Sequence, residues 1–188
     1  MKHKIGIFFL LSFFCWFLPF IARLFFFDIP EINTDYLEFD KNSITGTMDR
    51  IVQSVSENNR KDAFAIIFFN NLKGCLLNIV GGVMLGLGTF INLIFNGFFS
   101  ADIFANAYKS GLGIEAILKV TLPHSFELIG FWLSGSLGFY VASEIIQFIR
   151  GKENFTKKFY KKIGLFSIIV FVIILSAAYV EAYISSSM

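Results

Sequence analysis

Long apolar runs separated by shorter polar stretches dominate the chain. Each run is about long enough to cross a hydrocarbon core of ~30 Å as an α-helix, which rises 1.5 Å per residue. The pattern predicts an all-α, polytopic transmembrane helix bundle with five spans, at Ile5–Phe27, Ala63 to about Val83, about Leu87 to Ala107, His124–Gln147 and Ile163–Ile184.

The middle of the chain, residues 63–107, is long enough to cross the membrane once or twice. Its centre is rich in residues that favour a chain reversal, Gly81, Gly82, Gly86 and Gly88. Two crossings joined by this bend keep the acidic stretch before it and the basic stretch after the next span on opposite sides of the membrane. The alternative is a single span followed by a re-entrant segment at Gly111–Leu122.

Charged residues concentrate in two stretches of opposite sign. Residues 28–62 carry eight acidic and four basic side chains, and residues 150–162 carry six basic and one acidic side chain. Basic loops of membrane proteins favour the cytoplasm, so the N-terminus and the basic loop 150–162 are predicted inside and the acidic segment outside. Within residues 28–62, an amphipathic helix is predicted from apolar positions at Ile44, Met48, Ile51, Val52 and Val55.

Composition agrees with a membrane protein. The 188 residues are 55% hydrophobic and include 26 Phe, and the mean hydropathy is +0.67, which excludes an ordinary soluble domain. Residues 1–188 are therefore predicted to form a single membrane domain in the bacterial cytoplasmic membrane. The two cysteines, Cys15 and Cys75, both lie in apolar runs, so neither a disulfide framework nor a CxxC zinc site is expected. We expect no cofactor, no metal and no nucleic-acid partner.

Small residues recur at every fourth position in two of the predicted spans. Such stripes let helix backbones approach closely in lipid. The residues predicted to pack helices together are Gly74, Gly82, Gly86, Gly130, Ser134 and Gly138. The opposite side of the fourth span, with Leu128, Trp132 and Phe139, is expected to face lipid.

Polar side chains within the apolar runs predict an intramembrane network. Amides hydrogen-bond across helices in lipid, and an ammonium there must snorkel, pair or face water. The predicted members are Asn70, Asn71, Lys73, Asn78, Asn96, His124, Glu127 and Glu181. Arg23, near the outer end of the first span, is expected to snorkel rather than to pair with the acidic stretch beyond it.

His124 and Glu127 are the candidate catalytic residues. They lie three residues apart, so a helix presents them on neighbouring parts of one face. As an enzyme site, His124 would act as base or metal ligand and Glu127 as acid, with Ser125 or Lys73 as nucleophile. There is no HExxH motif, and one His with one Glu lacks the three protein ligands of catalytic zinc. A structural hydrogen-bonded pair is the favoured interpretation. A proton or ion conduit through Glu127, Lys73 and His124 is a further alternative.

The order of these motifs resembles the stage II sporulation protein M family. The similarity rests on Asn70-Asn71 before a glycine-rich span, Asn96-Gly97, Leu122-Pro123-His124 with Glu127, and Val180-Glu181-Ala182-Tyr183. The resemblance implies a small polytopic bacterial membrane protein. Founding members serve spore formation in a complex with peptidoglycan-degrading partners. Relatives accompany ATP-binding-cassette (ABC) transporter components, and one branch is encoded with circular bacteriocins. The Pro123-His124 pair is more similar to this wider group.

Several functions are compatible with these observations. The favoured one is a non-enzymatic accessory or scaffold protein of a peptide maturation, export or immunity system. It would work with ABC transporter subunits on a hydrophobic, circular bacteriocin-like peptide, and small-residue stripes permit a homo-oligomer. The chain has no GxxxxGK[ST] loop, so a separate ATPase would supply the energy, with residues 150–162 as its contact. The alternatives are a sporulation-type scaffold for peptidoglycan hydrolases and an intramembrane enzyme or ion conduit.

Overall fold

The computed structural model describes residues 3–27, 59–109, 124–152 and 155–183, without the side chains of His3, Lys4, His124 and Ser125. Its elements are α1 (His3–Phe26), α3 (Arg60–Gly81), the short 3₁₀ helix η2 (Gly82–Met84), α4 (Leu87–Lys109), α6 (His124–Ile149) and α7 (Lys157–Tyr183). In this part of the chain, five helices are long and apolar enough to cross a membrane. The all-α, five-span prediction is confirmed. The acidic segment from 28 to 58 and the re-entrant segment Gly111–Leu122 lie outside the described residues.

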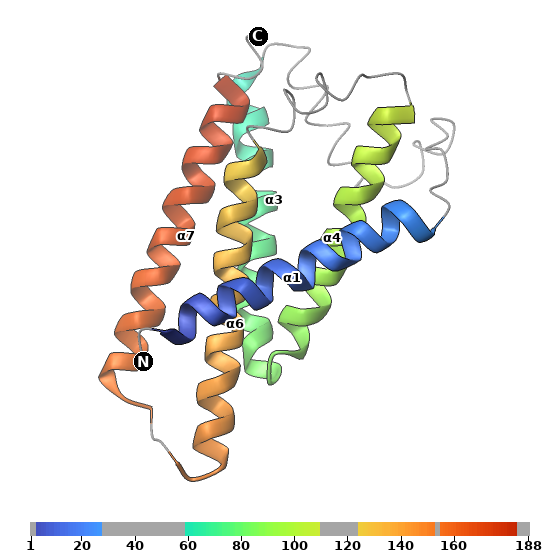
Figure 1. Ribbon diagram of the computed structural model, residues 1–188. Coiled ribbons are helices and arrows are strands. Elements are labelled where there is room, and N and C mark those ends of the chain that lie inside the picture. Colours follow the sequence, from blue (N-terminus) through green and yellow to red (C-terminus); the bar gives the residue numbers. More distant parts are fainter. Residues whose placement is uncertain (1–2, 28–58, 110–123, 153–154, 184–188) are drawn as a thin grey trace.

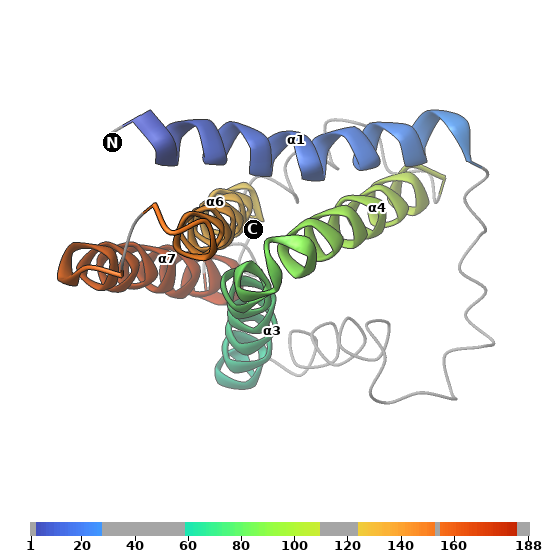
Figure 2. The ribbon, with the colours of Figure 1, turned by 90° about the horizontal axis from the view of Figure 1, so that it is seen from below.

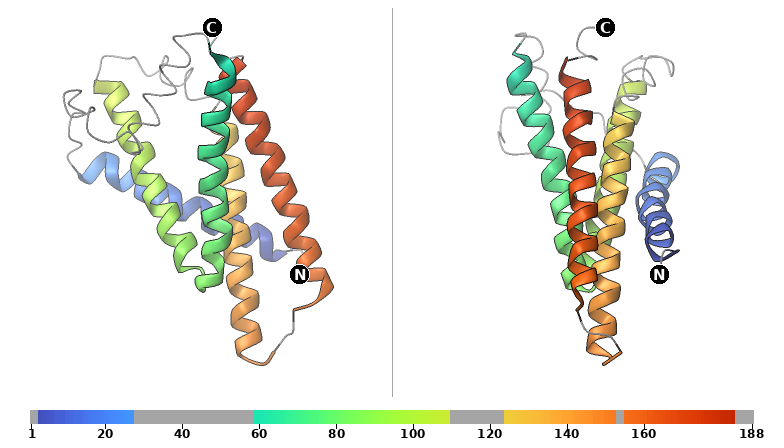
Figure 3. Two further views of the ribbon diagram at one scale, coloured as in Figure 1. Left: turned by 180° about the vertical axis from the view of Figure 1, so that it is seen from behind. Right: turned by 90° about the vertical axis from the view of Figure 1, so that its left-hand side faces the viewer.

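Three helices, α3, α6 and α7, run side by side, and α4 diverges from α3 after a tight reversal (Figures 1 and 3). The fifth helix, α1, lies obliquely across α4 and α6 on one side of the bundle (Figure 2). The start of α1 lies toward the same end of the bundle as the end of α6 and the start of α7, and the end of α7 lies at the other end (Figure 1). This alternation matches an odd number of crossings.

The reversal between α3 and α4 divides residues 63–107 between two helices, each long and apolar enough to cross a membrane. Leu85 has φ 54° and Gly86 has φ +87°, so two successive residues in the left-handed region turn the chain. Glycine takes this conformation at little cost, whereas leucine is strained in it. The ends of the two helices meet at Gly81 and Gly88, where a Cβ on either residue would overlap the backbone of the other.

Apolar packing joins α3 to α7 and α6 to the start of α7. The first cluster contains Ala63, Ile67, Phe68 and Cys75 of α3 with Val170, Ile174, Ala178 and Ala182 of α7. The second contains Leu137, Tyr140 and Val141 of α6 with Phe159 of α7. These contacts hold α6 and α7 at fixed positions beside α3, which is the setting for the polar site between α3, α4 and α6.

Two expectations about individual segments need correction. Trp132 does not face lipid, because α1 crosses α6 there. Its ring packs edge-on against Phe13 of α1 at 4.9 Å and against Trp16 at 5.5 Å between centroids. The predicted basic loop 150–162 is partly helical, since α7 begins at Lys157. Lys162 in its second turn lies 4.3 Å from the centre of the Tyr140 ring, a cation–π contact that ties it to α6.

Candidate functional site

Asn78 of α3 lies at the centre of a buried polar cluster between three helices. Its side chain is 0% exposed to solvent. The Nδ2 group donates hydrogen bonds to Ser134 Oγ of α6 at 3.0 Å and to the carbonyl oxygen of Phe131 at 3.2 Å. The backbone carbonyl oxygen of Asn78 accepts a hydrogen bond from Thr89 Oγ1 of α4 at 2.7 Å. One residue thus joins α3 to both α4 and α6.

Two further asparagines on α4 extend this cluster. Asn92 Nδ2 donates to Asn78 Oδ1 at 2.8 Å and to the carbonyl oxygen of Gly74 at 3.1 Å. Asn96 Nδ2 donates to Asn92 Oδ1 at 3.1 Å and to the Asn92 carbonyl oxygen at 2.8 Å. We call Asn78, Thr89, Asn92, Asn96 and Ser134 the asparagine network. It runs along the inside of the α3–α4 hairpin and reaches α6 through Ser134.

Glycines allow the backbones around the network to approach closely. A Cβ on Gly82 would lie against the carbonyl oxygen of Gly138 and 2.9 Å from its Cα and carbonyl carbon. A Cβ on Gly138 would overlap the Asn78 carbonyl and lie 3.0 Å from Thr89 Cγ2. Close backbone contact of this kind is how small residues hold helices together in lipid. The network and the glycine contact therefore belong to one interface.

The other predicted packing residues lie at different contacts. Gly74 faces the Phe131 ring, and a Cβ on this glycine would lie 3.2 Å from the nearest ring carbon. Gly86 lies beside Ala142 and Phe139 of α6, and Gly130 lies against Ile173 and Ile174 of α7. The small-residue stripe of α6 thus contacts the hairpin at one level and α7 at another.

Glu127 lies in the first turn of α6, near the edge of the network. It is half-buried and, like Ser134, it lies close to the buried thiol of Cys75 on α3. His124 is the first residue of α6, and its side chain is outside the described part of the structure. The pairing of His124 with Glu127 therefore stays a prediction. Among the described residues, no three His, Cys, Asp or Glu side chains gather in a way that could hold a metal ion.

Four predicted members lie away from the network. Asn70 and Lys73 are exposed on α3, and Asn71 is half-buried there without joining it. Glu181 lies in the last turns of α7, beside Ala182, which packs in the α3–α7 cluster. Lys73 and Cys75 are two residues apart on a helix, so they point to opposite sides of α3. The structure consequently does not bring Lys73 together with Glu127, as a conduit through both would require.

The match to a known family covers nearly the whole chain. The family described as stage II sporulation protein M matches residues 5–186. The chain belongs to this family.

A relative of this stage II sporulation protein M family chain is an uncharacterized protein of Methanocaldococcus jannaschii. The two are 32% identical over 125 residues, which cover 65% of this chain and 70% of the relative. No solved structure matches the chain. The family and the five helices that are long and apolar enough to cross a membrane both agree with a membrane protein.

Arg23 of this family member forms an ion pair, contrary to the expectation that it snorkels. Its Nε lies 2.7 Å from Oδ1 of Asp102 on α4, and both side chains are partly buried. The pair exists because Gly97 lets α1 approach α4: a Cβ there would overlap the Trp16 carbonyl of α1. Arg23 lies seven residues after Trp16 and Asp102 lies five residues after Gly97, so both are one to two helical turns further along the same interface.

The network predicted from the sequence did not include Thr89 or Asn92. Ser134 was predicted only as a packing residue. A signal for Asn92 was present. Residues equally distant from the centre of a helical hairpin face each other, and Asn78 and Asn92 are each seven positions from Leu85. The network holds helices together, because its amides and hydroxyls donate hydrogen bonds to oxygen atoms of neighbouring helices.

Proposed function

We propose that this stage II sporulation protein M family chain is a non-enzymatic membrane scaffold that works with an ABC transporter in a peptide maturation, export or immunity system. The cargo would be a hydrophobic, circular bacteriocin-like peptide. The observation that carries the scaffold role is the asparagine network, because its polar groups bind one helix to another. Polar groups that are hydrogen-bonded to one another keep the helices in fixed positions. A scaffold that binds partners needs such a rigid frame.

The proposed contact with a cytoplasmic ATPase lies at the end of the bundle where α6 connects to α7. Basic side chains at this end are exposed, namely Arg150, Lys152, Lys157, Lys158 and Lys161. Three of them, Lys157, Lys158 and Lys161, lie in the first two turns of α7, so a rigid helix presents part of the charge. A positive patch of this kind attracts an acidic protein surface and speeds association.

The test is a mild-detergent pull-down of the tagged protein from its own host, with partners identified by mass spectrometry. One variant replaces Lys152, Lys157, Lys158 and Lys161 with Gln. The matched control is Lys61→Gln, which removes an exposed charge at the other end of the bundle. The native protein and the control should recover an ABC transporter ATPase or permease, and the four-site variant should recover at least tenfold less.

Other outcomes would overturn the proposal. Recovery of peptidoglycan hydrolases in place of a transporter would favour the sporulation-type scaffold. Recovery of the chain alone, with an uncut precursor peptide accumulating in a Glu127→Gln strain, would favour an intramembrane enzyme at Glu127 and His124. Mass measurement of the purified complex in the same experiment gives the number of copies of this chain.

A further inference from the structure

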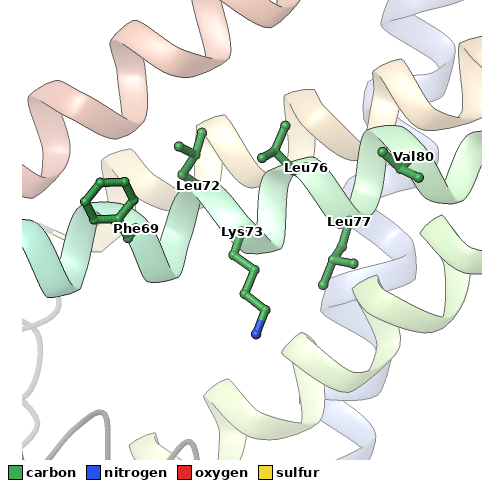
Figure 4. Close-up of a pocket in the computed structure, with 6 residues that line it drawn as sticks. All are labelled: Phe69, Leu72, Lys73, Leu76, Leu77 and Val80. Atoms are coloured by element: carbon green, nitrogen blue, oxygen red, sulfur yellow. The ribbon is translucent and has the colours of Figure 1, made fainter.

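An apolar hollow with one lysine runs along the outer face of α3. It measures about 300 Å³ and is lined by residues of this helix alone, Phe69, Leu72, Lys73, Leu76, Leu77 and Val80. We call these six residues the Lys73 groove. Figure 4 shows the Lys73 side chain extending from α3 into the space on the side of α4. The volume of the Lys73 groove is at the lower end of the range for ligand pockets, ~300–1,000 Å³. The groove therefore fits side chains of a docked helix rather than a whole small molecule.

The spacing of the groove residues is that of a helix–helix seam. Positions 69, 73, 76 and 80 follow one another by four, three and four residues, which places them on one narrow stripe of a helix. Phe69, Leu76, Leu77 and Val80 are each at least half exposed. The groove therefore offers a second helix a continuous ridge of side chains, and no described helix of this chain occupies it.

Lys73 lies deep within the span. It is about 20 Å from the start of α3 and about 12 Å from its end, at 1.5 Å per residue. Helical side chains lean toward the N-terminus of their helix, here the more distant boundary. Among the described residues, Lys73 forms no ion pair and is not part of the asparagine network. An ammonium at this depth is costly unless it snorkels, faces water or pairs with a negative group, and the lean of the Lys73 side chain toward the more distant boundary disfavours snorkelling.

The depth of Lys73 selects the class of partner. Lipid phosphates lie at the membrane boundary, roughly 15 Å from the centre of a ~30 Å core. A carboxylate on a transmembrane helix, in contrast, is found inside the core and there pairs with opposite charge. The apolar walls of the groove fit the remainder of such a helix.

We propose that the Lys73 groove binds a partner transmembrane helix that carries an aspartate or glutamate near its middle. This deepens the proposed function, on which it rests, by naming the membrane-embedded contact with a transporter subunit or hydrophobic peptide. Lys73 pairs with the carboxylate, and Leu76, Leu77 and Val80 pack against the turns that flank it. Arginine keeps the charge at this position, whereas methionine keeps only the apolar stem.

The test measures binding of synthetic peptides to the purified full-length protein in nanodiscs of zwitterionic lipid, by fluorescence energy transfer. The probe is a leucine-rich transmembrane peptide with one central Asp, and its matched control has Asn at that position. The Asp peptide should bind the native protein and Lys73→Arg at least tenfold more tightly than Lys73→Met. The Asn peptide should bind all three proteins equally weakly. Thermal unfolding of each variant confirms that the exposed substitution leaves the fold intact.

Several results would overturn the proposal. Equal binding of the Asp and Asn peptides, or no effect of Lys73→Met, removes the carboxylate pairing. Loss of Asp-peptide binding when anionic phosphatidylglycerol is added assigns the ammonium to lipid. Lys73-dependent dimerisation assigns the groove to a second copy of this chain. The pull-down tests the basic end of the bundle, so each proposal fails separately.

Discussion

The substitution Gly82→Ala tests whether close backbone contact between the α3–α4 hairpin and α6 holds the fold together. The new Cβ would overlap the Gly138 carbonyl oxygen and lie 2.9 Å from the Gly138 carbonyl carbon. Ordinary contact begins at 3.4 Å, so the hairpin and α6 must separate by more than 0.5 Å, which is 3.4 minus 2.9 Å. The Gly138 atoms at the clash belong to the backbone, and an alanine side chain has no rotamers, so no side-chain movement relieves the clash.

The separation also weakens the hydrogen bonds beside the glycine contact. Asn78 Nδ2 lies 3.0 Å from Ser134 Oγ and 3.2 Å from the Phe131 carbonyl oxygen, and a further 0.5 Å brings both to the limit of a hydrogen bond or beyond it. Overpacking costs about 1–3 kcal/mol. Two interhelical hydrogen bonds in a membrane add roughly 0.6 kcal/mol each. The expected loss in free energy of unfolding is therefore about 2–4 kcal/mol.

The measurement is reversible unfolding in mixed micelles, followed by tryptophan fluorescence. Both tryptophans, Trp16 and Trp132, lie where α1 meets α6, so they report on loss of the bundle. Gly164→Ala is the matched control, because a Cβ on Gly164 would meet nothing within 4 Å. This control should stay within ~0.5 kcal/mol of the native protein.

A loss below ~0.5 kcal/mol for Gly82→Ala would refute the reasoning, since it would mean that the two backbones are not in contact. A second variant checks the mechanism. Gly138→Ala opens the same interface from the α6 side, so the double variant should lose less than the sum of the single losses. Full additivity would show that the two glycines act at independent sites.

Three further predictions use the same unfolding assay. Asn78→Ala should cost about 2–3 kcal/mol by removing hydrogen bonds to two helices, while the exposed Asn70→Ala should cost less than ~0.5 kcal/mol, and equal losses would contradict the role of the network. Leu85→Gly should gain about 0.5–1 kcal/mol, because it relieves the left-handed backbone at φ 54°, and a loss would show that the leucine side chain contributes more than the strain. Arg23→Met and Asp102→Asn should show a coupling energy of ~1 kcal/mol in a double-mutant cycle, and zero coupling would contradict the ion pair.

Features set by local sequence could be predicted from the chain. The five spans follow from runs of apolar residues, and the reversal between α3 and α4 follows from glycines at its centre. The α6 stripe is buried at all four of its positions, Gly130, Ser134, Gly138 and Ala142. These features need only the helical period and the sizes of the side chains.

Features set by how helices cross could not be predicted in the same way. The oblique course of α1 decides that Trp132 is covered and that Arg23 meets Asp102. Arg23 and Asp102 are far apart in sequence, and either residue alone is compatible with snorkelling. The crossing depends on Gly97, which belongs to a motif whose sequence gives no indication that its partner is the first helix.

The polar residues of the membrane region divide into two groups by the direction in which they point, and this division links the structure to the proposed role. Asn78 and Asn92 face each other across the hairpin and share one hydrogen bond, so they need nothing from outside the chain. Lys73 is five positions before Asn78, which turns it through about 500°, or 140° beyond one full turn, toward the outside of the same helix. One side of α3 is thus satisfied internally, and the other carries the charge of Lys73, for which we propose a carboxylate partner. A helix with these two sides is suited to hold a fixed frame while it receives a second membrane protein.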